Sequence, residues 1–163
     1  MELTEASFKW FKILLDPTSK FRGVAEPVVT SQNLLGSLDK TAEDVAADYL
    51  RLIWQYTKND IQKLKGAEWE RDYAVRVVLT VPAIWSPKAK DTTLRVAKAA
   101  GLPSAVQLVS EPEAAALAVL KDRNDDDSSL QVGDAFVVCD AGGGTVVSLA
   151  CRIIRADLTP RRI

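Results

Sequence analysis

The chain is 163 residues long, 47% hydrophobic and 26% charged, with a formal net charge of −1 and no histidine. This length suffices for one domain with a sizeable core, and the balanced charge gives no bulk attraction to nucleic acid or an anionic membrane. The lack of histidine excludes histidine-based metal sites and Ser-His or Cys-His catalysis. The N-terminus, MELTEASFKWFKILLDP, is not typical of a secretory signal, and no apolar run is long enough to cross a bilayer. We therefore expect a soluble protein of the cytoplasm.

The first forty residues carry weak structural signals. Apolar residues at helical spacing predict a helix over residues 3–15, which Asp16 and Pro17 would end. Glycines and prolines interrupt residues 18–37, which we expect to form an irregular connection. We therefore separate residues 1–40, a helix and a connection, from the rest of the chain.

A long helix is predicted over residues 41–65. Thr41 and Asp44 have the spacing of a capping box, in which two side chains satisfy backbone donors at the start of a helix. An apolar stripe at i, i+4, i+7 and i+11 predicts side chains that pack in the interior rather than contact a ligand. These residues are Val45, Tyr49, Leu52 and Tyr56.

Strands and helices alternate from residue 74 onward. AVRVVLTVPA, residues 74–83, predicts a buried, valine-rich strand. Ser86 and Pro87 supply an N-cap and a first-turn proline for a helix that ends at Gly101. VQLVS and DAFVVCD predict two further strands, separated by the helix PEAAALAVLK and the acidic loop DRNDDDSS.

The two cysteines, Cys139 and Cys151, both lie in strand-like stretches. Free cysteine is among the most frequently buried residue types. We therefore expect two small core residues in a reducing compartment.

Residues 136–147, FVVCDAGGGTVV, join two strand-like stretches through three glycines. A dinucleotide-binding glycine loop must open a helix, which is not predicted here, and a P-loop needs a lysine, which is absent. The remaining phosphate-binding option is a β-hairpin turn whose backbone N–H groups form an anion nest. From the residues alone, the glycines can equally form a simple tight hairpin, with Asp140 as a turn aspartate, and a helix-start acid that interacts with the dipole is the favoured interpretation of Glu111.

Three blocks of sequence, taken together, resemble the ATPase domain of the heat-shock protein 70 chaperones, members of the actin-like ATPase superfamily. LTVPAIWSPKAKDTTLRVAKAAGL is similar to the family's T-V-P-A-Y-F strand and the helix that ends in A-G-L. LVSEPEAAALAVL is similar to N-E-P-T-A-A-A-L-A, and VVCDAGGGTVV to the second phosphate motif, D-L-G-G-G-T-F-D. The blocks occur in the family's order over residues 74–147. The W-F-K-I-L-L-D start and the variant Ile84-Trp85-Ser86 indicate a divergent branch.

The resemblance implies an α/β fold. Residues 41–163 would form a partial ribonuclease H-like, actin-like ATPase lobe: a mixed sheet flanked by helices, with a glycine-rich β-hairpin as phosphate loop. They would include the first lobe and the start of the second, whereas residues 1–40 match the family only loosely.

The resemblance also implies functional roles with ATP or ADP and Mg²⁺. Asp140 would hold magnesium through water, and Glu111 would lie near the metal and the attacking water. Backbone donors and one hydroxyl would contact the β- and γ-phosphates, from Gly142, Gly143, Gly144 and Thr145. Pro82 would couple nucleotide state to the rest of a chaperone. The chemistry would be positioning and charge neutralisation.

Some positions depart from the family pattern. Val147 stands where the family motif has an acid, which lowers the charge available to magnesium, and Glu113 replaces a threonine. Nothing before residue 41 resembles the first phosphate loop, and little sequence follows the second. Half a cleft would leave the phosphates in water, where electrostatic contacts are weak. We therefore expect weak or absent nucleotide binding and no ATP hydrolysis by this chain alone.

Three hypotheses for function follow. The first is a fragment of a heat-shock-type ATP-binding domain, which in a longer form would also meet co-chaperones or clients. The second is a degenerate, non-catalytic interaction domain or a truncated gene product. The third, another actin-like ATPase such as a sugar kinase, is disfavoured by the S-E-P-E-A-A-A block. No nucleic-acid or membrane partner is expected. An incomplete lobe would expose apolar edges, which predicts self-association and marginal stability.

Overall fold

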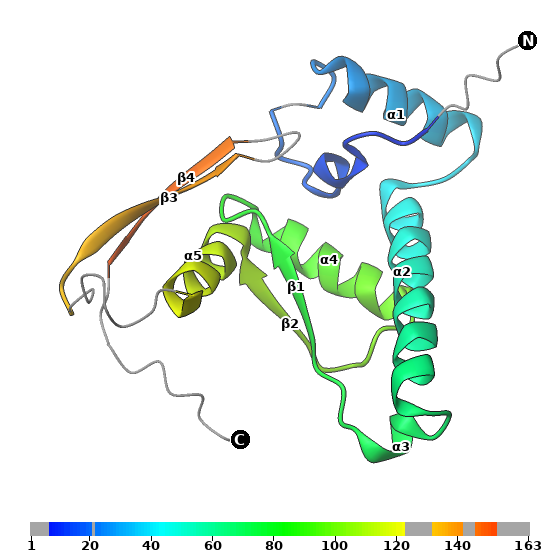
Figure 1. Cartoon of the computed structure of the whole chain (residues 1–163). Coiled ribbons are helices and arrows are strands. Elements are labelled where there is room, and N and C mark those ends of the chain that lie inside the picture. The colour runs from blue at the N-terminus through cyan, green and yellow to red at the C-terminus, as the bar shows by residue number, and fades with distance from the viewer. Residues whose placement is uncertain (1–6, 21, 123–131, 142–145, 153–163) are drawn as a thin grey trace, which may run out of the picture. The chain divides into compact units, whose positions relative to one another are not determined.

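The computed structural model describes residues 7–20, 22–122, 132–141 and 146–152. These residues form two compact units, one of Met1–Leu79 with Ile84–Leu108 and one of Thr80–Ala83 with Val109–Ile163. The elements are mixed α and β, which agrees with the expected class (Figure 1). In chain order they are η1 (Phe11–Leu15), α1 (Glu26–Ser37), α2 (Ala42–Lys65), α3 (Trp69–Asp72), β1 (Val77–Val81), α4 (Pro87–Ala99), β2 (Val106–Ser110), α5 (Glu111–Asp122), β3 (Ala135–Ala141) and β4 (Val146–Arg152).

An irregular connection was predicted over residues 18–37, and this prediction is wrong for residues 26–37, which form helix α1. Pro27 falls in the first turn of the helix, where its missing N–H group is not needed. Val28, Ser31 and Leu35 follow at helical spacing, and all three are buried. The proline and glycine of this segment are therefore compatible with a helix, which is stabilised by burial of the face that carries these three side chains.

The helix predicted over residues 3–15 is reduced, in its described part, to the 3-10 helix η1. Residues 7–10 are not helical. The N–H of Lys9 donates to Ser31 Oγ at 2.9 Å, and this hydroxyl donates to the carbonyl of Lys9 at 2.6 Å. Because both backbone groups of Lys9 bind α1, they are not available for hydrogen bonds within a helix.

A hydrophobic cluster joins η1, α1 and the first turn of α2. Its buried members are Leu14, Val28, Leu35 and Val45, with Phe8, Phe11 and Ile13 among the partly buried side chains around them. Burial of a Leu or Val side chain contributes about 1.5–3 kcal/mol. This cluster is therefore a main source of stability for the N-terminal part of the first unit.

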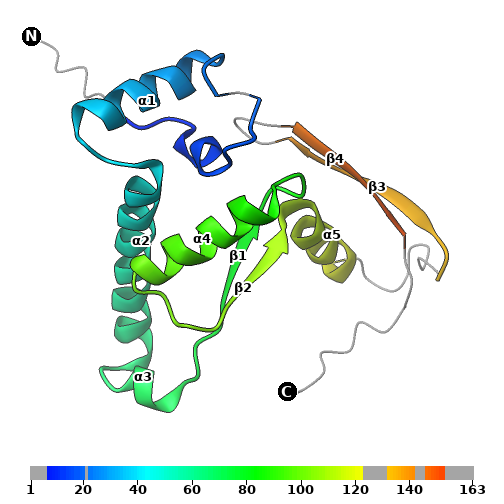
Figure 2. The same ribbon diagram turned by 180° about the vertical axis from the view of Figure 1, so that it is seen from behind.

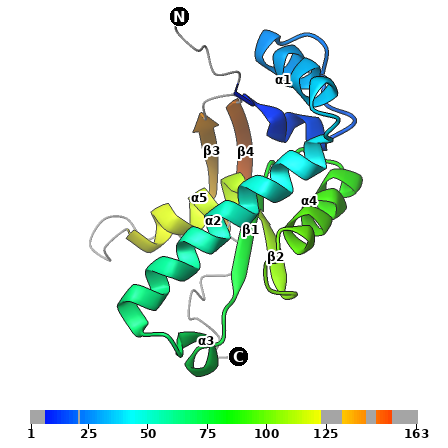
Figure 3. The same cartoon turned by 90° about the vertical axis from the view of Figure 1, so that its right-hand side faces the viewer.

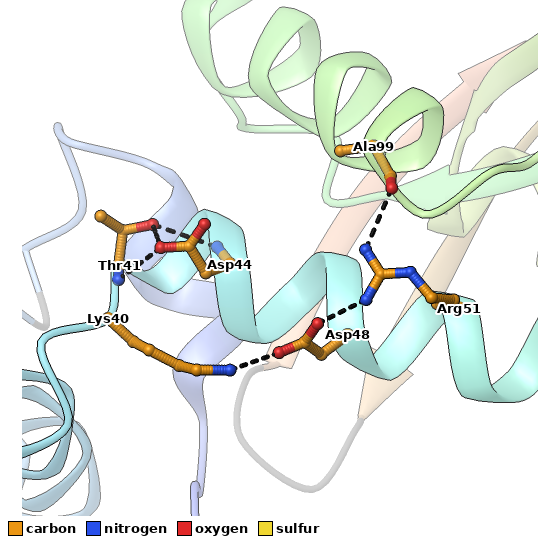
Figure 4. Close-up of polar contacts among 6 residues, drawn as sticks. All are labelled: Lys40, Thr41, Asp44, Asp48, Arg51 and Ala99. Carbon is orange, nitrogen blue, oxygen red and sulfur yellow. Dashed lines mark hydrogen bonds and ion pairs between the residues drawn. The ribbon is translucent and has the colours of Figure 1, made fainter.

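Helix α2 begins with the predicted capping box, which is confirmed (Figure 4). The N–H of Asp44 donates to Thr41 Oγ1 at 3.1 Å, and the N–H of Thr41 donates to Asp44 Oδ2 at 2.9 Å. Hydrogen bonds from the side chain and backbone of Thr41 lower the pKa of Asp44. At the other end, Gly66 follows α2 with a positive φ of 93°, which suits glycine.

The interior packing predicted for the apolar stripe of α2 is only partly correct. Val45 is buried, but Tyr49 is 54%, Leu52 67% and Tyr56 68% exposed. Val45 and Tyr49 lie near η1, whereas Leu52 and Tyr56 lie farther along the helix. Periodicity identified one face of the helix but not how far along it that face is covered.

An ionic chain connects α2 to α4 (Figure 4). Lys40 and Arg51 donate to the two carboxylate oxygens of Asp48, each at 2.5 Å, and these bonds lower the pKa of Asp48. The second terminal nitrogen of Arg51 donates to the carbonyl of Ala99 at 3.1 Å. Ala99 is the last residue of α4, so Arg51 satisfies one of the carbonyls that a helix leaves unpaired at its C-terminus.

Strands β1 and β2 form a two-stranded sheet and run in the same direction, joined by α4 (Figure 1). The predicted N-cap is confirmed, because Ser86 Oγ accepts a hydrogen bond from the N–H of Ala89 at 3.2 Å. Gly101 has a φ of 81° just after α4, as predicted for its C-terminal stop. The expectation of a fully buried β1 is wrong, because Val78 is 52% exposed while Val81 is buried. A sheet with one exposed face gives this alternation.

The buried carboxylate of Asp16 joins the N-terminal segment to α4. It accepts hydrogen bonds at Oδ1 from the N–H and hydroxyl of Thr18, at 3.0 and 2.8 Å, and from Ser86 Oγ at 3.1 Å. Burial alone would raise the pKa of Asp16, but the hydrogen bonds from Thr18 and Ser86, helped by the charge of Arg22, lower it.

The second unit contains α5 and the ribbon of β3 and β4 (Figure 2). The two strands pair antiparallel from Ala135 opposite Arg152 to Ala141 opposite Val146. Helix α5 contacts both β3 and β4. Within the described residues, no helix is both long and apolar enough to cross a membrane.

Replacement of Asp16 by asparagine tests the buried carboxylate. A lowered folded-state pKa adds stability above the unfolded-state pKa of about 3.9, and this stability is lost as pH falls through the folded-state value. Asp16→Asn should therefore lower the unfolding free energy at pH 7 by about 1–2 kcal/mol and reduce the loss of stability on acidification. Urea unfolding between pH 3 and 7 measures both effects. Asp39→Asn, at an exposed residue whose positive φ asparagine tolerates, is the control.

Replacement of Arg51 tests the link between α2 and α4. Arg51→Ala should lower the melting temperature by about 1–4 °C, because the carbonyl of Ala99 and the carboxylate of Asp48 both lose a donor. The matched control is Arg71→Ala, because the ion pairs of Arg71 are with Glu68 and Asp72, close in sequence. Equal thermal shifts for the two variants would contradict a stabilising role for Arg51 between the helices.

Candidate functional site

The predicted site residues outside the glycine loop all belong to the second compact unit. Pro82 lies in its short segment Thr80–Ala83, and Glu111 and Asp140 lie in Val109–Ile163. The glycines Gly142, Gly143 and Gly144, together with Thr145, fall outside the described residues, as do residues 123–129 of the acidic loop DRNDDDSS. The structure therefore describes the framework on either side of the glycines.

The C-terminal ends of β1 and β2 carry two of the predicted residues. β1 ends at Val81, which is 2% exposed, and Pro82 follows it and is also buried. β2 ends at Ser110, and Glu111 is the first residue of α5. Because the strands are neighbours and run in the same direction, both residues follow strands that end at the same edge of the sheet.

A side-chain cap holds the start of α5. Ser110 Oγ accepts a hydrogen bond from the N–H of Glu113 at 3.4 Å and lies 3.4 Å from Glu113 Oε2. Pro112, in the first turn, is fully buried, whereas Glu113 is exposed. The exposed side chain of Glu113 agrees with a solvated first-turn acid. Glu111 carries its charge at the positive end of the helix dipole, where an anion is stabilised.

The ribbon of β3 and β4 flanks the glycines with paired strands. Asp140 is opposite Val147, and Ala141 is opposite Val146. The prediction of strands on both sides of the glycines is therefore confirmed, and the connection between the two strands is residues 142–145. Helix α5, which begins at Glu111, contacts the strand that contains Asp140.

The expectation that both cysteines are core residues is wrong for Cys139, whose side chain is exposed. Cys139 is opposite Ser148 in the ribbon, and Cys151 is opposite Phe136. Since side chains alternate along a strand, the two cysteines lie on opposite faces of the ribbon. Both are free thiols, and Cys151 is partly buried.

Sequence reasoning missed a second candidate, which lies on α2 in the first unit. It comprises exposed apolar side chains and, next to them, a groove that reaches Ala67. The stretch DYLRLIWQY places apolar residues on all sides of one helix, which a single buried face does not require. Among the described residues, no group of three or more acidic or cysteine side chains is arranged to hold a metal ion.

Comparison with known proteins identifies the family. The Hsp70 protein family model matches residues 26–154. The chaperone protein HscA homolog of Herminiimonas arsenicoxydans is 32% identical over 123 residues, which cover 76% of this chain and 15% of that protein. The chaperone protein DnaK of Ureaplasma parvum serovar 3 is 29% identical over 149 residues, which cover 85% of this chain and 22% of that protein. DnaK of Mycoplasma mycoides subsp. mycoides SC matches with the same identity and coverage.

The chain spans about a fifth of the length of these curated relatives or less. No solved structure matches it. The family match begins at residue 26, so it includes helix α1, which the sequence blocks did not reach. It also covers all three blocks that carry the resemblance. Because the match extends over most of the sequence, the chain belongs to the Hsp70 protein family.

Proposed function

We propose that this chain provides the second phosphate-binding loop of an Hsp70-type nucleotide site. The backbone N–H groups of the loop would donate to the β- and γ-phosphates of ATP or ADP, aided by a hydroxyl group. The residues concerned are Gly142, Gly143, Gly144 and Thr145. The observation that carries the proposal is the antiparallel register of β3 and β4, which pair up to Ala141 and Val146. Paired strands on both sides constrain such a loop, and glycines allow an anion to approach the backbone closely.

Asp140 is the proposed magnesium-associated carboxylate. Bound Mg²⁺ would neutralise charge on the phosphates and would keep most of its water shell. One carboxylate next to a row of amide donors fits a metal that is held through water. Val147, opposite Asp140, offers no second carboxylate, so we expect this site to hold magnesium only weakly without the phosphates.

Glu111 is the proposed acid that orients the attacking water. Support comes from the capped start of α5 and from the contact of this helix with β3. The cap fixes the backbone from which Glu111 projects, and a carboxylate placed in this way suits a positioning role rather than covalent catalysis.

Pro82 is the proposed coupling residue. It is buried and follows β1, in the segment Thr80–Ala83 where the chain passes briefly through the second unit. The ring of proline fixes φ and leaves little local freedom. A displacement of the segment Thr80–Ala83 would therefore move β1 and α4 as well, because Pro82 allows little change in the backbone torsion angles between them.

The wider activity follows from the family and is part of the proposal. The chain would act as part of an ATP-binding chaperone domain of the cytoplasm and would not hydrolyse ATP alone. An alternative is a degenerate interaction domain without nucleotide. The apolar residue opposite Asp140, where the family motif has an acid, favours this alternative.

Titration with nucleotide tests the proposal. We expect the full chain to bind Mg-ADP with a dissociation constant of hundreds of micromolar or weaker, because phosphates exposed to water are held weakly. Asp140→Asn should weaken magnesium-dependent binding by about tenfold or more, since a charged interaction is lost. Calorimetry with and without EDTA measures both effects.

Two matched acids provide the control in this experiment. Glu111→Gln should weaken magnesium-dependent nucleotide binding, because it removes a charge expected near the metal, whereas Glu113→Gln, two residues along the same helix, should not. Nucleotide binding that changes neither with EDTA nor with Asp140→Asn would favour the degenerate interaction domain. Micromolar affinity with steady ATP turnover by this chain alone would refute its proposed inactivity.

A further inference from the structure

The exposed apolar side chains of α2 form one surface. We call it the α2 stripe, and it consists of Tyr49, Leu52, Ile53 and Tyr56, which are 54%, 67%, 44% and 68% exposed. Their spacing of i, i+3, i+4 and i+7 places them on one side of the helix, along about two turns. Four large apolar side chains exposed together are unusual for a surface helix, which normally has a polar outer face.

The α2 stripe continues the hydrophobic cluster at the N-terminal end of α2. The rings of Tyr49 and Phe11 meet edge to face, with centroids 6.0 Å apart. The 3-10 helix η1 lies beside this end of α2, while α4 lies along another side (Figures 1 and 3). Beyond Tyr49 the side chains on the same side of the helix are still apolar but are exposed to solvent. The hydrophobic cluster therefore continues into an exposed apolar surface.

A groove lies next to the far end of the stripe. It has a volume of about 460 Å³ and is lined by Tyr56, Asn59, Gln62, Lys63 and Ala67. The lining offers one ammonium group, two amides and an aromatic ring, and no carboxylate. The side chain of Lys63 is 74% exposed, and its ammonium has an ion pair with Asp60 at 3.0 Å, which occupies one of its three donors. Because Asp60 already balances the charge of Lys63, the remaining donors of this ammonium and the amides of Asn59 and Gln62 are the groups that an acidic residue would meet in the groove.

The size of the α2 stripe limits what can cover it. Two tyrosines, a leucine and an isoleucine at these exposures present on the order of 400 Å² of mainly apolar surface. A stable interface between globular proteins buries about 800 Å² on each partner. The stripe with its groove is therefore large enough for one short segment, and too small for a stable dimer of this chain.

We propose that the α2 stripe and its groove dock a short amphipathic helix of another protein. Apolar side chains of that helix would pack between Leu52, Ile53 and Tyr56, as the ridges of one helix pack into the grooves of another. An acidic residue about one turn beyond them would reach Lys63, and the amides of Asn59 and Gln62 would bind polar groups next to it. This surface lies in the first unit and does not require nucleotide binding.

The test uses a fluorescein-labelled peptide helix as a probe. It has leucines at i, i+3, i+4 and i+7 and two glutamates one turn beyond; a second version has lysines in place of the glutamates. A scrambled peptide of the same composition measures non-specific binding. Fluorescence anisotropy should show that the full chain binds the glutamate peptide at least about tenfold more tightly than the scrambled one.

Four variants distinguish specific binding at the α2 stripe from non-specific binding of the peptide. Leu52→Asp should weaken binding of the glutamate peptide by about tenfold, whereas Val24→Asp, at a residue that is 80% exposed elsewhere in the unit, should not. Lys63→Glu should weaken the glutamate peptide and strengthen the lysine peptide, whereas Lys98→Glu on α4 should change neither. Thermal melts establish that each variant is folded.

Two results would overturn the proposal. The first is a failure of specificity in peptide binding: the designed and scrambled peptides bind equally, or the Lys63→Glu variant binds the glutamate and lysine peptides as the unchanged chain does. The second is a concentration-dependent dimer in sedimentation velocity that Leu52→Asp abolishes, because a second copy of this chain would then cover the stripe.

Discussion

In the first unit, the contact between the N-terminal segment and α4 depends on the buried carboxylate of Asp16. A carboxylate removed from water costs several kcal/mol unless donors replace its hydration. Asp16 receives three hydrogen bonds, two from Thr18 and one from Ser86. Ser86 also caps α4, so the same hydroxyl serves both the N-terminal segment and the helix that joins β1 to β2. If the segment around Asp16 moved away, the carboxylate would lose the hydrogen bond from Ser86, and the hydroxyl that caps α4 would lose its acceptor. This constraint explains how residues that match the family loosely remain part of the compact unit.

Signals that act over a few residues predicted the fold well. The capping box of α2, the serine and proline that begin α4, and the glycine after α4 each satisfy backbone groups within one turn of the chain. Their geometry does not depend on distant contacts. The same holds for the strands on either side of the glycines, where apolar and β-branched residues indicate pairing.

The failures came where distant residues decide the conformation. Lys9 is non-helical because Ser31, far along the chain, binds both of its backbone groups. Helix α1 was missed because Pro27 was taken as an interruption, although the first turn of a helix tolerates it. Leu52 was expected in the core because periodicity shows that a face is apolar but cannot show what covers it. The candidate site has the same limit, since the contact between α5 and β3 joins segments that no local pattern relates.

Two kinds of surface in one chain follow from its division into units. The proposed phosphate loop would present its backbone donors between paired strands, and β3 and β4 in the second unit are the strands that pair. The proposed docking of an apolar helix would use the exposed side chains of α2 in the first unit, a helix with a capping box at one end and a hydrogen bond from Arg51 to α4. β1 and β2 each begin in the first unit and end in the second. These two strands therefore belong to both units, and the buried Pro82 follows directly at the end of one of them.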